Sequence, residues 1–209
     1  MAPKPFKVDP AALAAAMGAI LIIELLAGWV LRALPLPAYG RLGMVRALQS
    51  AAIVAIFLFR GQGLNTLGWA PRDWPRGIRI GMFWSLGFGA AALLGMVLIH
   101  LVGHYPLQWL RIPLPRRNVE LVLLFLVGGL IGPLAEELFF RGVLYAYFRR
   151  WGIAAALAAS TAIFALLHFN AVPVTQVVGG LVFALAYERH RNLMVPIVIH
   201  VLGNSVLFA

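Results

Sequence analysis

Apolar stretches of membrane-spanning length follow one another along this chain, separated by short polar connections. A helix needs about 17–25 predominantly apolar residues to cross a bilayer. The stretches of roughly this kind are residues 11–34, 42–60, 78–102, 119–148, 152–169, 173–188 and 192–208. The fourth is longer than one crossing requires, and the last two are short. Because only helices and closed barrels satisfy their backbone groups in lipid, the pattern predicts an all-α, polytopic transmembrane helix bundle of about seven spans, within a range of six to eight.

The composition agrees with a membrane bundle and excludes an ordinary soluble domain. Hydrophobic residues make up 62% of the 209 residues and charged residues only 11%, whereas soluble domains carry roughly 25% charged residues. No soluble domain, internal repeat or low-complexity tract interrupts the chain. We therefore expect residues 1–209 to form a single integral membrane domain.

The basic residues lie singly or in pairs between the apolar stretches, although the formal net charge is +10. This distribution indicates contact with anionic lipid headgroups, and it excludes nucleic acid as a partner because no compact basic stripe exists. If the N-terminus is cytoplasmic, ten Lys and Arg residues, Lys4 and Lys7 among them, fall on the cytoplasmic side and six, including Arg111, on the other. The positive-inside rule therefore favours a cytoplasmic N-terminus, and the composition is typical of a bacterial inner-membrane protein.

Two adjacent carboxylates, Glu136 and Glu137, lie inside the fourth apolar stretch. A charged side chain at membrane depth costs about 2.5–3.5 kcal/mol on insertion scales, so an intramembrane acid indicates a functional site. The whole chain has only seven acidic residues. Glu137 and Arg141 are spaced i, i+4 and can pair on one helix face. Glu136 is rotated by about 100° from Glu137, which leaves it free to face a cavity as a general base or acid.

Two further polar pairs interrupt later apolar stretches, Phe164-xxx-His168 and His200-xxx-Asn204. Each pair has helical i, i+4 spacing and so lies along one helix face. Hydrolysis of a peptide bond within a membrane requires an activated water and donors for the oxyanion. Glu136 and His168 can activate the water, while His200 and Asn204 can donate to the oxyanion. The alternative is that these side chains only hold helices together by hydrogen bonds.

A metal ion is a second open possibility. Two histidines and a glutamate, here His168, His200 and Glu136, can form a three-ligand catalytic Zn²⁺ site with one open position. The His-Glu-xx-His spacing of helical zinc proteases is absent. Zinc-dependent hydrolysis and metal-free activation of water by glutamate and histidine therefore both remain open.

In this order, the motifs Glu136-Glu137-xxx-Arg141, Phe164-xxx-His168 and His200-xxx-Asn204 resemble the signature of the CPBP family of CAAX-processing and bacteriocin-processing intramembrane proteases, which includes abortive-infection proteins. The resemblance covers the motif-bearing core, about residues 119–208. It implies a catalytic base at Glu136 that works with His168, and an oxyanion-stabilising side at His200 and Asn204. It further implies that Arg141, paired with Glu137, organises the site.

The sequence leaves three functions open. The first is an intramembrane endopeptidase that cleaves a membrane-anchored peptide or protein, possibly near its C-terminus. The others are a non-catalytic membrane immunity or scaffold protein of the same fold, and a proton-coupled transporter that uses the same carboxylates. Prenylated CAAX tails, bacteriocin leaders and sorting tails all fit as substrates. Glu24, the acid in the first apolar stretch, is expected to face the bundle with a hydrogen-bond partner or to line the substrate cavity.

Overall fold

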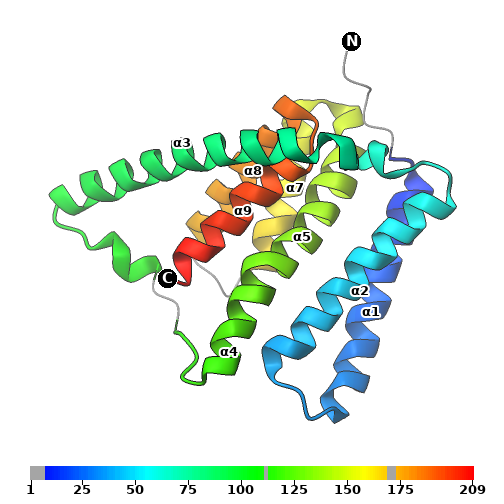
Figure 1. The fold of residues 1–209 in the computed structure, drawn as a ribbon. Helices are drawn as coiled ribbons and strands as arrows, with labels where there is room; N and C mark the ends of the chain where they lie inside the picture. Colours follow the sequence, from blue (N-terminus) through cyan, green and yellow to red (C-terminus); the bar gives the residue numbers. More distant parts are fainter. Residues whose placement is uncertain (1–7, 111–112, 169–172) are drawn as a thin grey trace.

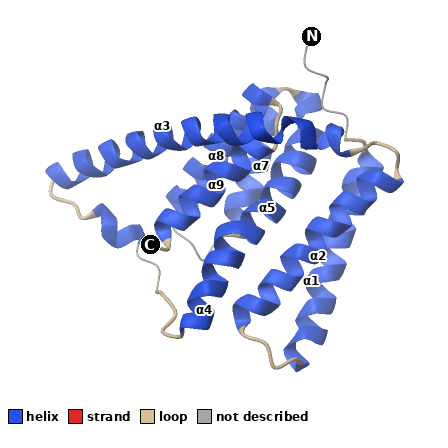
Figure 2. Cartoon of the chain, viewed as in Figure 1, coloured by secondary structure: helices blue, strands red, loops and turns tan. Residues whose placement is uncertain are grey.

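The computed structural model describes residues 8–110, 113–168 and 173–209, and every regular element in these ranges is helical (Figure 1, Figure 2). The long helices are α1 (Pro10–Val30), α2 (Ala38–Phe59), α3 (Trp74–Leu101), α7 (Ile153–Leu167), α8 (Pro173–His190) and α9 (Met194–Leu207). A further helical stretch is continuous from Asn118 to Trp151. The predicted all-α class is confirmed, and each predicted apolar stretch coincides with one of these helices. Residue 169 and the charges at Lys4, Lys7 and Arg111 lie outside the described residues.

The number of membrane spans is supported in part. Within the described ranges, four helical stretches are long and apolar enough to cross a membrane: Pro10–Val30, Ala38–Phe59, Leu64–Leu101 and Asn118–Trp151. Helices α7 and α9 are apolar but have only 15 and 14 residues. At 1.5 Å per residue they are shorter than a hydrocarbon core of about 30 Å. The helical stretch that corresponds to the fourth predicted span, Asn118–Trp151, has 34 residues and is longer than one crossing requires, as expected.

The stretch from Asn118 to Trp151 is the central element of the bundle. Helices α1 and α2 form a pair, and α2 packs against the central stretch (Figure 1). Helices α7 and α9 contact the same stretch, and α8 packs against both α7 and α9. Helix α3 follows α9 along its first half and then runs away from the bundle (Figure 1). The central stretch thus contacts both the α1–α2 pair and the C-terminal helices.

Two π-helical segments interrupt the central stretch. It consists of α4 (Asn118–Leu123), η5 (Leu124–Ile131), α5 (Gly132–Glu137), η6 (Leu138–Tyr145), α6 (Ala146–Phe148) and η7 (Arg149–Trp151), of which η5 and η6 are π-helical. The N–H of Gly132 bonds the carbonyl of Val127, five residues earlier. Pro133 has no N–H to donate, and the wider turn lies just before it. Since π-turns often occur at functional sites, it is notable that α5, which carries both intramembrane glutamates, lies between two of them.

The connection between α2 and α3 is attached to the corner between α8 and α9. The N–H of Leu193 donates to the Gly68 carbonyl at 2.9 Å, and the Tyr187 hydroxyl donates to the Leu67 carbonyl at 2.9 Å. Gly68 has a φ of +68°, and a Cβ there would lie 2.7 Å from the Arg191 carbonyl oxygen. Glycine is therefore required both by the backbone conformation and by the close approach. This attachment fixes where α9 begins.

Helices α3 and α9 approach closely at a second glycine. Asn192, which precedes α9, donates from Nδ2 to the Asp73 carbonyl at 2.8 Å and accepts at Oδ1 from the Met194 N–H at 3.0 Å. A Cβ on Gly77 would lie 2.6 Å from that Oδ1 and 2.7 Å from the Met194 Cβ. The Asn192 amide therefore joins the start of α3 to the start of α9 only because residue 77 has no side chain.

We expect Gly77→Ala to destabilise the protein by about 1–3 kcal/mol, because the new methyl group would displace Asn192 or Met194. The measurement is the thermal unfolding midpoint of the purified protein in detergent. Gly87→Ala is the matched control on the same helix, since nothing lies within 4 Å of a Cβ there. It should be neutral or slightly stabilising, because alanine favours helix more than glycine. Equal midpoints for the two variants would contradict the prediction.

Candidate active site

A cavity of about 290 Å³ lies between α2, the central stretch and the C-terminal helices. Apolar side chains such as Leu42 and Phe208 form part of its wall, and Gly128 and Gly132 bring the main chain close to it. Its polar lining residues are Arg46, Glu136, His168, Gln176, His200 and Asn204. The structure therefore brings the four predicted catalytic residues, Glu136, His168, His200 and Asn204, to one cavity.

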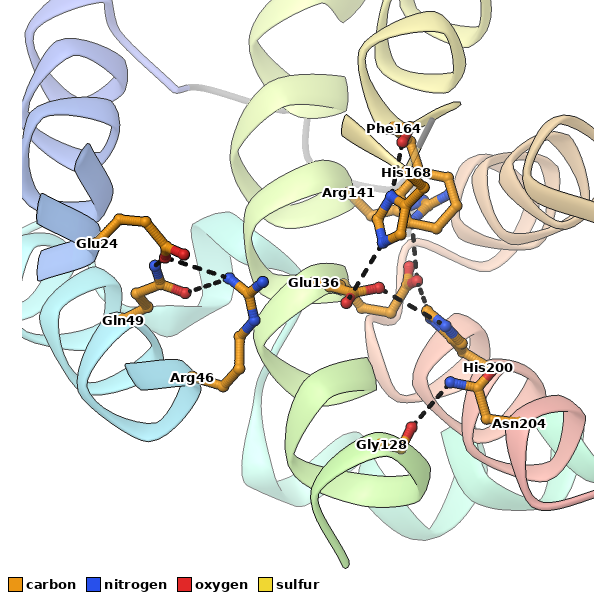
Figure 3. A network of polar contacts seen from close by, with 11 residues as sticks. Glu24, Arg46, Gln49, Gly128, Glu136, Arg141, Phe164, His168, His200 and Asn204 are labelled. Carbon is orange, nitrogen blue, oxygen red and sulfur yellow. Dashed lines mark hydrogen bonds and ion pairs between the residues drawn. The ribbon is translucent and has the colours of Figure 1, made fainter. Parts of the chain in front are cut away.

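Glu136, on α5, lies between the two histidines (Figure 3). Its Oε1 is 3.7 Å from Nε2 of His168, and its Oε2 is 3.7 Å from Nε2 of His200. Both distances are too long for direct hydrogen bonds. The Glu136 side chain is 19% exposed, whereas that of Glu137 is completely buried. The structure therefore places Glu136 at the cavity, as expected, and Glu137 away from it.

Glu137 binds two partners through a single oxygen. Its Oε1 accepts from Nη1 of Arg141 at 2.8 Å and is 2.8 Å from Nδ1 of His200. The i, i+4 pair with Arg141 was predicted from the spacing and is confirmed. The contact with His200 was not predicted, because it joins residues that are 63 positions apart. Glu137 therefore holds both the buried arginine and one ring nitrogen of a site histidine.

Arg141 is buried among aromatic rings. Its guanidinium carbon lies 4.9 Å from the centroid of Phe164 and 5.2 Å from that of Phe183. Its Nη2 also donates to the Gly180 carbonyl on α8 at 3.1 Å. Ring faces attract cations, and a planar guanidinium stacks well on them. Arg141 thus joins the central stretch to α7 and α8.

Phe164 contributes to the site through both its ring and its backbone. Besides contacting Arg141, its carbonyl oxygen is 2.7 Å from Nδ1 of His168. A carbonyl can only accept, so Nδ1 of His168 carries a proton and Nε2 is the nitrogen directed toward Glu136. His168 immediately follows the end of α7. The backbone of that last turn therefore sets the tautomer of the histidine.

The ring of His200 is held on one face by an aromatic ring, in addition to the contact of its Nδ1 with Glu137. It stacks on Phe183 with a centroid separation of 4.6 Å and an interplanar angle of 21°. Asn204, one turn later on α9, donates from Nδ2 to the Gly128 carbonyl at 2.8 Å. That hydrogen bond uses one of its two amide protons and joins α9 to η5. Asn204 therefore has a positioning contact that the sequence did not predict.

Glu24 has the hydrogen-bond partner that was expected of a bundle-facing acid. Its Oε2 accepts from Nε2 of Gln49 at 2.8 Å, and Oε1 of Gln49 accepts from Nη1 of Arg46 at 2.7 Å (Figure 3). Arg46 was not predicted as a site residue, yet it lines the cavity. The signal that identifies it is the same one that identified Glu136: a charged residue within an apolar stretch, here 42–60.

The described residues contain no group of three His, Cys, Asp or Glu side chains arranged to hold a metal ion. Zinc ligands lie about 2.0–2.2 Å from the ion and point to a single position. In the proposed ligand set of Glu136, His168 and His200, the two imidazoles instead approach opposite oxygens of the carboxylate. The residues as placed do not fit a zinc site.

We expect Arg141→Met to destabilise the protein by about 3–5 kcal/mol, because it leaves the buried Glu137 carboxylate without its cation. The double variant Glu137→Gln/Arg141→Met should lose less than the sum of the two single variants, since neither residue then leaves a buried charge. The measurement is a double-mutant cycle, in which the unfolding midpoints of the wild type, the two single variants and the double variant are compared in detergent. Additive losses would contradict the coupling.

The comparisons with known proteins match the C-terminal part of this chain. Residues 118–206 match the family described as type II CAAX prenyl endopeptidase, Rce1-like. The membrane-embedded CAAX protease MroQ of Staphylococcus aureus (strain USA300) is 36% identical over 98 residues, which cover 43% of this chain and 38% of that protein. The match thus spans well under two thirds of this curated relative. No solved structure matches significantly. The four predicted catalytic residues, Glu136, His168, His200 and Asn204, all lie within residues 118–206, the part of this chain that is similar to the Rce1-like type II CAAX prenyl endopeptidases.

Proposed function

We propose that this chain is an integral membrane endopeptidase that hydrolyses a peptide bond of a membrane-associated peptide or protein, near the substrate's C-terminus. The observation that carries the proposal is the position of the Glu136 carboxylate. Glu136 belongs to an apolar helix, and its carboxylate lies at the cavity, between the Nε2 atoms of two imidazoles. The family match over residues 118–206 supports a peptidase. The relative's designation as a CAAX protease supports cleavage near a C-terminus.

Glu136 is the base that removes a proton from the attacking water. The neutral His168 carries its proton on Nδ1, which donates a hydrogen bond to the Phe164 carbonyl oxygen. The Nε2 of His168 can therefore accept a hydrogen bond from the same water. A water bound at both residues donates one hydrogen bond to the Glu136 carboxylate and one to Nε2 of His168. Because both of its hydrogens are held in this way, a lone pair of its oxygen points toward the substrate carbonyl. This arrangement is general base catalysis, which contributes about 10²–10⁴-fold to a rate.

His200 is suited to stabilise the oxyanion when it is protonated. Its Nδ1 faces the Glu137 carboxylate, so in the neutral ring Nε2 would have no proton to donate. The cluster of Glu136, Glu137 and Arg141 has two negative charges and one positive charge, and a protonated His200 makes it neutral. A buried cluster with no net charge avoids the large penalty of an unpaired charge. The imidazolium then donates from Nε2.

The proton transfers balance over the reaction. The water transfers one proton to Glu136, and the resulting hydroxide forms a bond to the carbonyl carbon. His200 and the free amide proton of Asn204 donate to the oxyanion. Glu136 then gives its proton to the leaving nitrogen as the C–N bond breaks, which releases an amine and a carboxylic acid. The acid ionises by transferring its own proton to the amine or to solvent. Glu137 and Arg141 do not touch the substrate in this scheme; they position His200.

The remaining assignments follow from this function. We propose that residues 1–209 form one protease domain whose helices α7 to α9 complete a bundle of about seven spans. The charge count supports a cytoplasmic N-terminus, and the membrane-embedded bacterial relative supports the bacterial cytoplasmic membrane. The substrate is a membrane-anchored peptide or protein.

We expect Glu136→Gln and His168→Ala each to lower the rate of cleavage by about 10²–10⁴-fold, because each removes an acceptor for the attacking water. The assay uses protein in liposomes and an internally quenched peptide ending in the CAAX pattern, with and without a prenyl group on its cysteine. Glu120→Gln is the matched control, since Glu120 lies on the same continuous helix but outside the cavity. It should cleave at the wild-type rate. Normal turnover by Glu136→Gln would eliminate Glu136 as the base.

Because the scheme uses only side chains as base and donors, cleavage should persist when divalent metal ions are removed. The measurement is the cleavage rate after dialysis against a strong chelator, together with elemental analysis of zinc per chain in the wild type and in Glu136→Gln. We expect an unchanged rate and no difference in zinc content between the two proteins. Stoichiometric zinc that is lost in Glu136→Gln, with activity restored by added zinc, would establish a metalloprotease instead.

A further inference from the structure

Arg46 is a cation in the wall of the cavity that the hydrolytic scheme does not use. It lies on α2 and lines the same cavity as Glu136 and His168. Its side chain is 29% exposed, so it is neither fully buried nor free in solvent. A charge placed inside an apolar stretch and beside a reaction site requires an explanation.

The guanidinium of Arg46 is held from one side only. Among the described residues, the polar contacts of Arg46 involve Nη1, which donates to Gln49 at 2.7 Å and lies 3.8 Å from Oε2 of Glu24. Gln49 in turn donates to Glu24 at 2.8 Å. Glu24 and Gln49 therefore orient the guanidinium while its Nε and Nη2 stay available. Figure 3 shows Arg46 between this pair and the Glu136 site.

The available edge is the one that binds carboxylates. Arginine pairs with a carboxylate most strongly through two parallel N–H donors. In this chain Arg149 uses Nε and Nη2 in that way, at 3.0 Å and 3.1 Å from the two oxygens of Glu188. In Arg46, which lines the cavity, the same two donors have no partner among the residues that the structure describes. Glu24 compensates the charge of Arg46 only in part, because its side chain is 55% exposed and 3.8 Å away.

We propose that Arg46 binds the terminal carboxylate of the substrate and thereby selects chains that end a short distance beyond the scissile bond. This inference rests on the proposed endopeptidase function. The size of the cavity supports it: about 290 Å³ is just below the range for ligand pockets, roughly 300–1,000 Å³, so the cavity suits only a short segment such as the last few residues of a chain. A terminal carboxylate is the one anionic group that every such chain end carries.

The test compares two versions of one internally quenched, prenylated CAAX peptide, with a free C-terminal carboxylate and with a C-terminal carboxamide. We expect the wild type to favour the acid by about tenfold or more in kcat/KM, because a site built to bind a polar group discriminates against an analogue that lacks it. Arg46→Gln should lose this preference, mainly through a higher KM for the acid. Its kcat/KM for the amide should equal that of the wild type, which also shows that the variant is folded.

Two further variants refine the comparison. Arg46→Lys keeps the charge without the paired donors and should retain an intermediate preference. Arg41→Gln, on the same helix but outside the cavity, should behave as the wild type. An acid preference that survives in Arg46→Gln, or an equal loss of both activities in that variant, would overturn the proposal. A wild type that cleaves both peptides equally would also overturn it, whereas a wild type that cleaves neither would overturn the proposed function itself.

Anionic lipid is the other source of a negatively charged group for Arg46. The assays are therefore run in neutral detergent and repeated with added phosphatidylglycerol. The acid preference of the wild type should be the same in both. A difference between Arg46→Gln and the wild type that occurs only with phosphatidylglycerol would assign Arg46 to a lipid headgroup and overturn the proposal.

Discussion

The buried ion pair between Glu137 and Arg141 is the constraint on which the C-terminal half depends. Both side chains are fully buried, and a pair taken out of water is tolerated only when further hydrogen bonds satisfy it. Those bonds come from other helices: His200 on α9 contacts Glu137, and Gly180 on α8 accepts from Arg141. The ring of Phe164 brings α7 to the same guanidinium. The charges therefore determine where three helices meet, more than they add stability.

This arrangement is not fully satisfied. Among the described residues, three buried polar atoms in this region have no hydrogen-bond partner: Oε2 of Glu137, Nε of Arg141 and Oγ1 of Thr161. Thr161 packs against Gly180, whose carbonyl binds Arg141. Each unsatisfied buried group costs about 1–3 kcal/mol. Active sites commonly keep such local costs because function requires the geometry, and a purely structural core would bury apolar side chains here.

Sequence reasoning predicted the features that depend on local spacing. The membrane cost of charge identified Glu136 and Glu137, and the i, i+4 rule paired Glu137 with Arg141. The same arguments located His168 and His200, but they could not show which atoms meet, because those contacts join separate helices. The Glu137–His200 contact, the Asn204–Gly128 hydrogen bond and the presence of Arg46 at the cavity are all of this non-local kind. The course of α3 away from the bundle was also not predicted, because an apolar sequence such as that of its second half fits a helix inside the bundle equally well.

The adjacency of the two glutamates follows from the geometry of one imidazole ring. His200 meets Glu137 at Nδ1, at 2.8 Å, and Glu136 at Nε2, at 3.7 Å. Two nitrogens of a single ring can address two carboxylates only if those carboxylates are close together yet point in different directions. Consecutive residues on a helix meet both conditions, because they are about 1.5 Å apart along the axis and about 100° apart around it. Two glutamates spaced i, i+4 would lie on one face of the helix. Their carboxylates would then point in the same direction, and one could not bind the ring while the other faced the cavity. The Glu-Glu dipeptide thus lets one carboxylate hold the histidine while the other stays available for water.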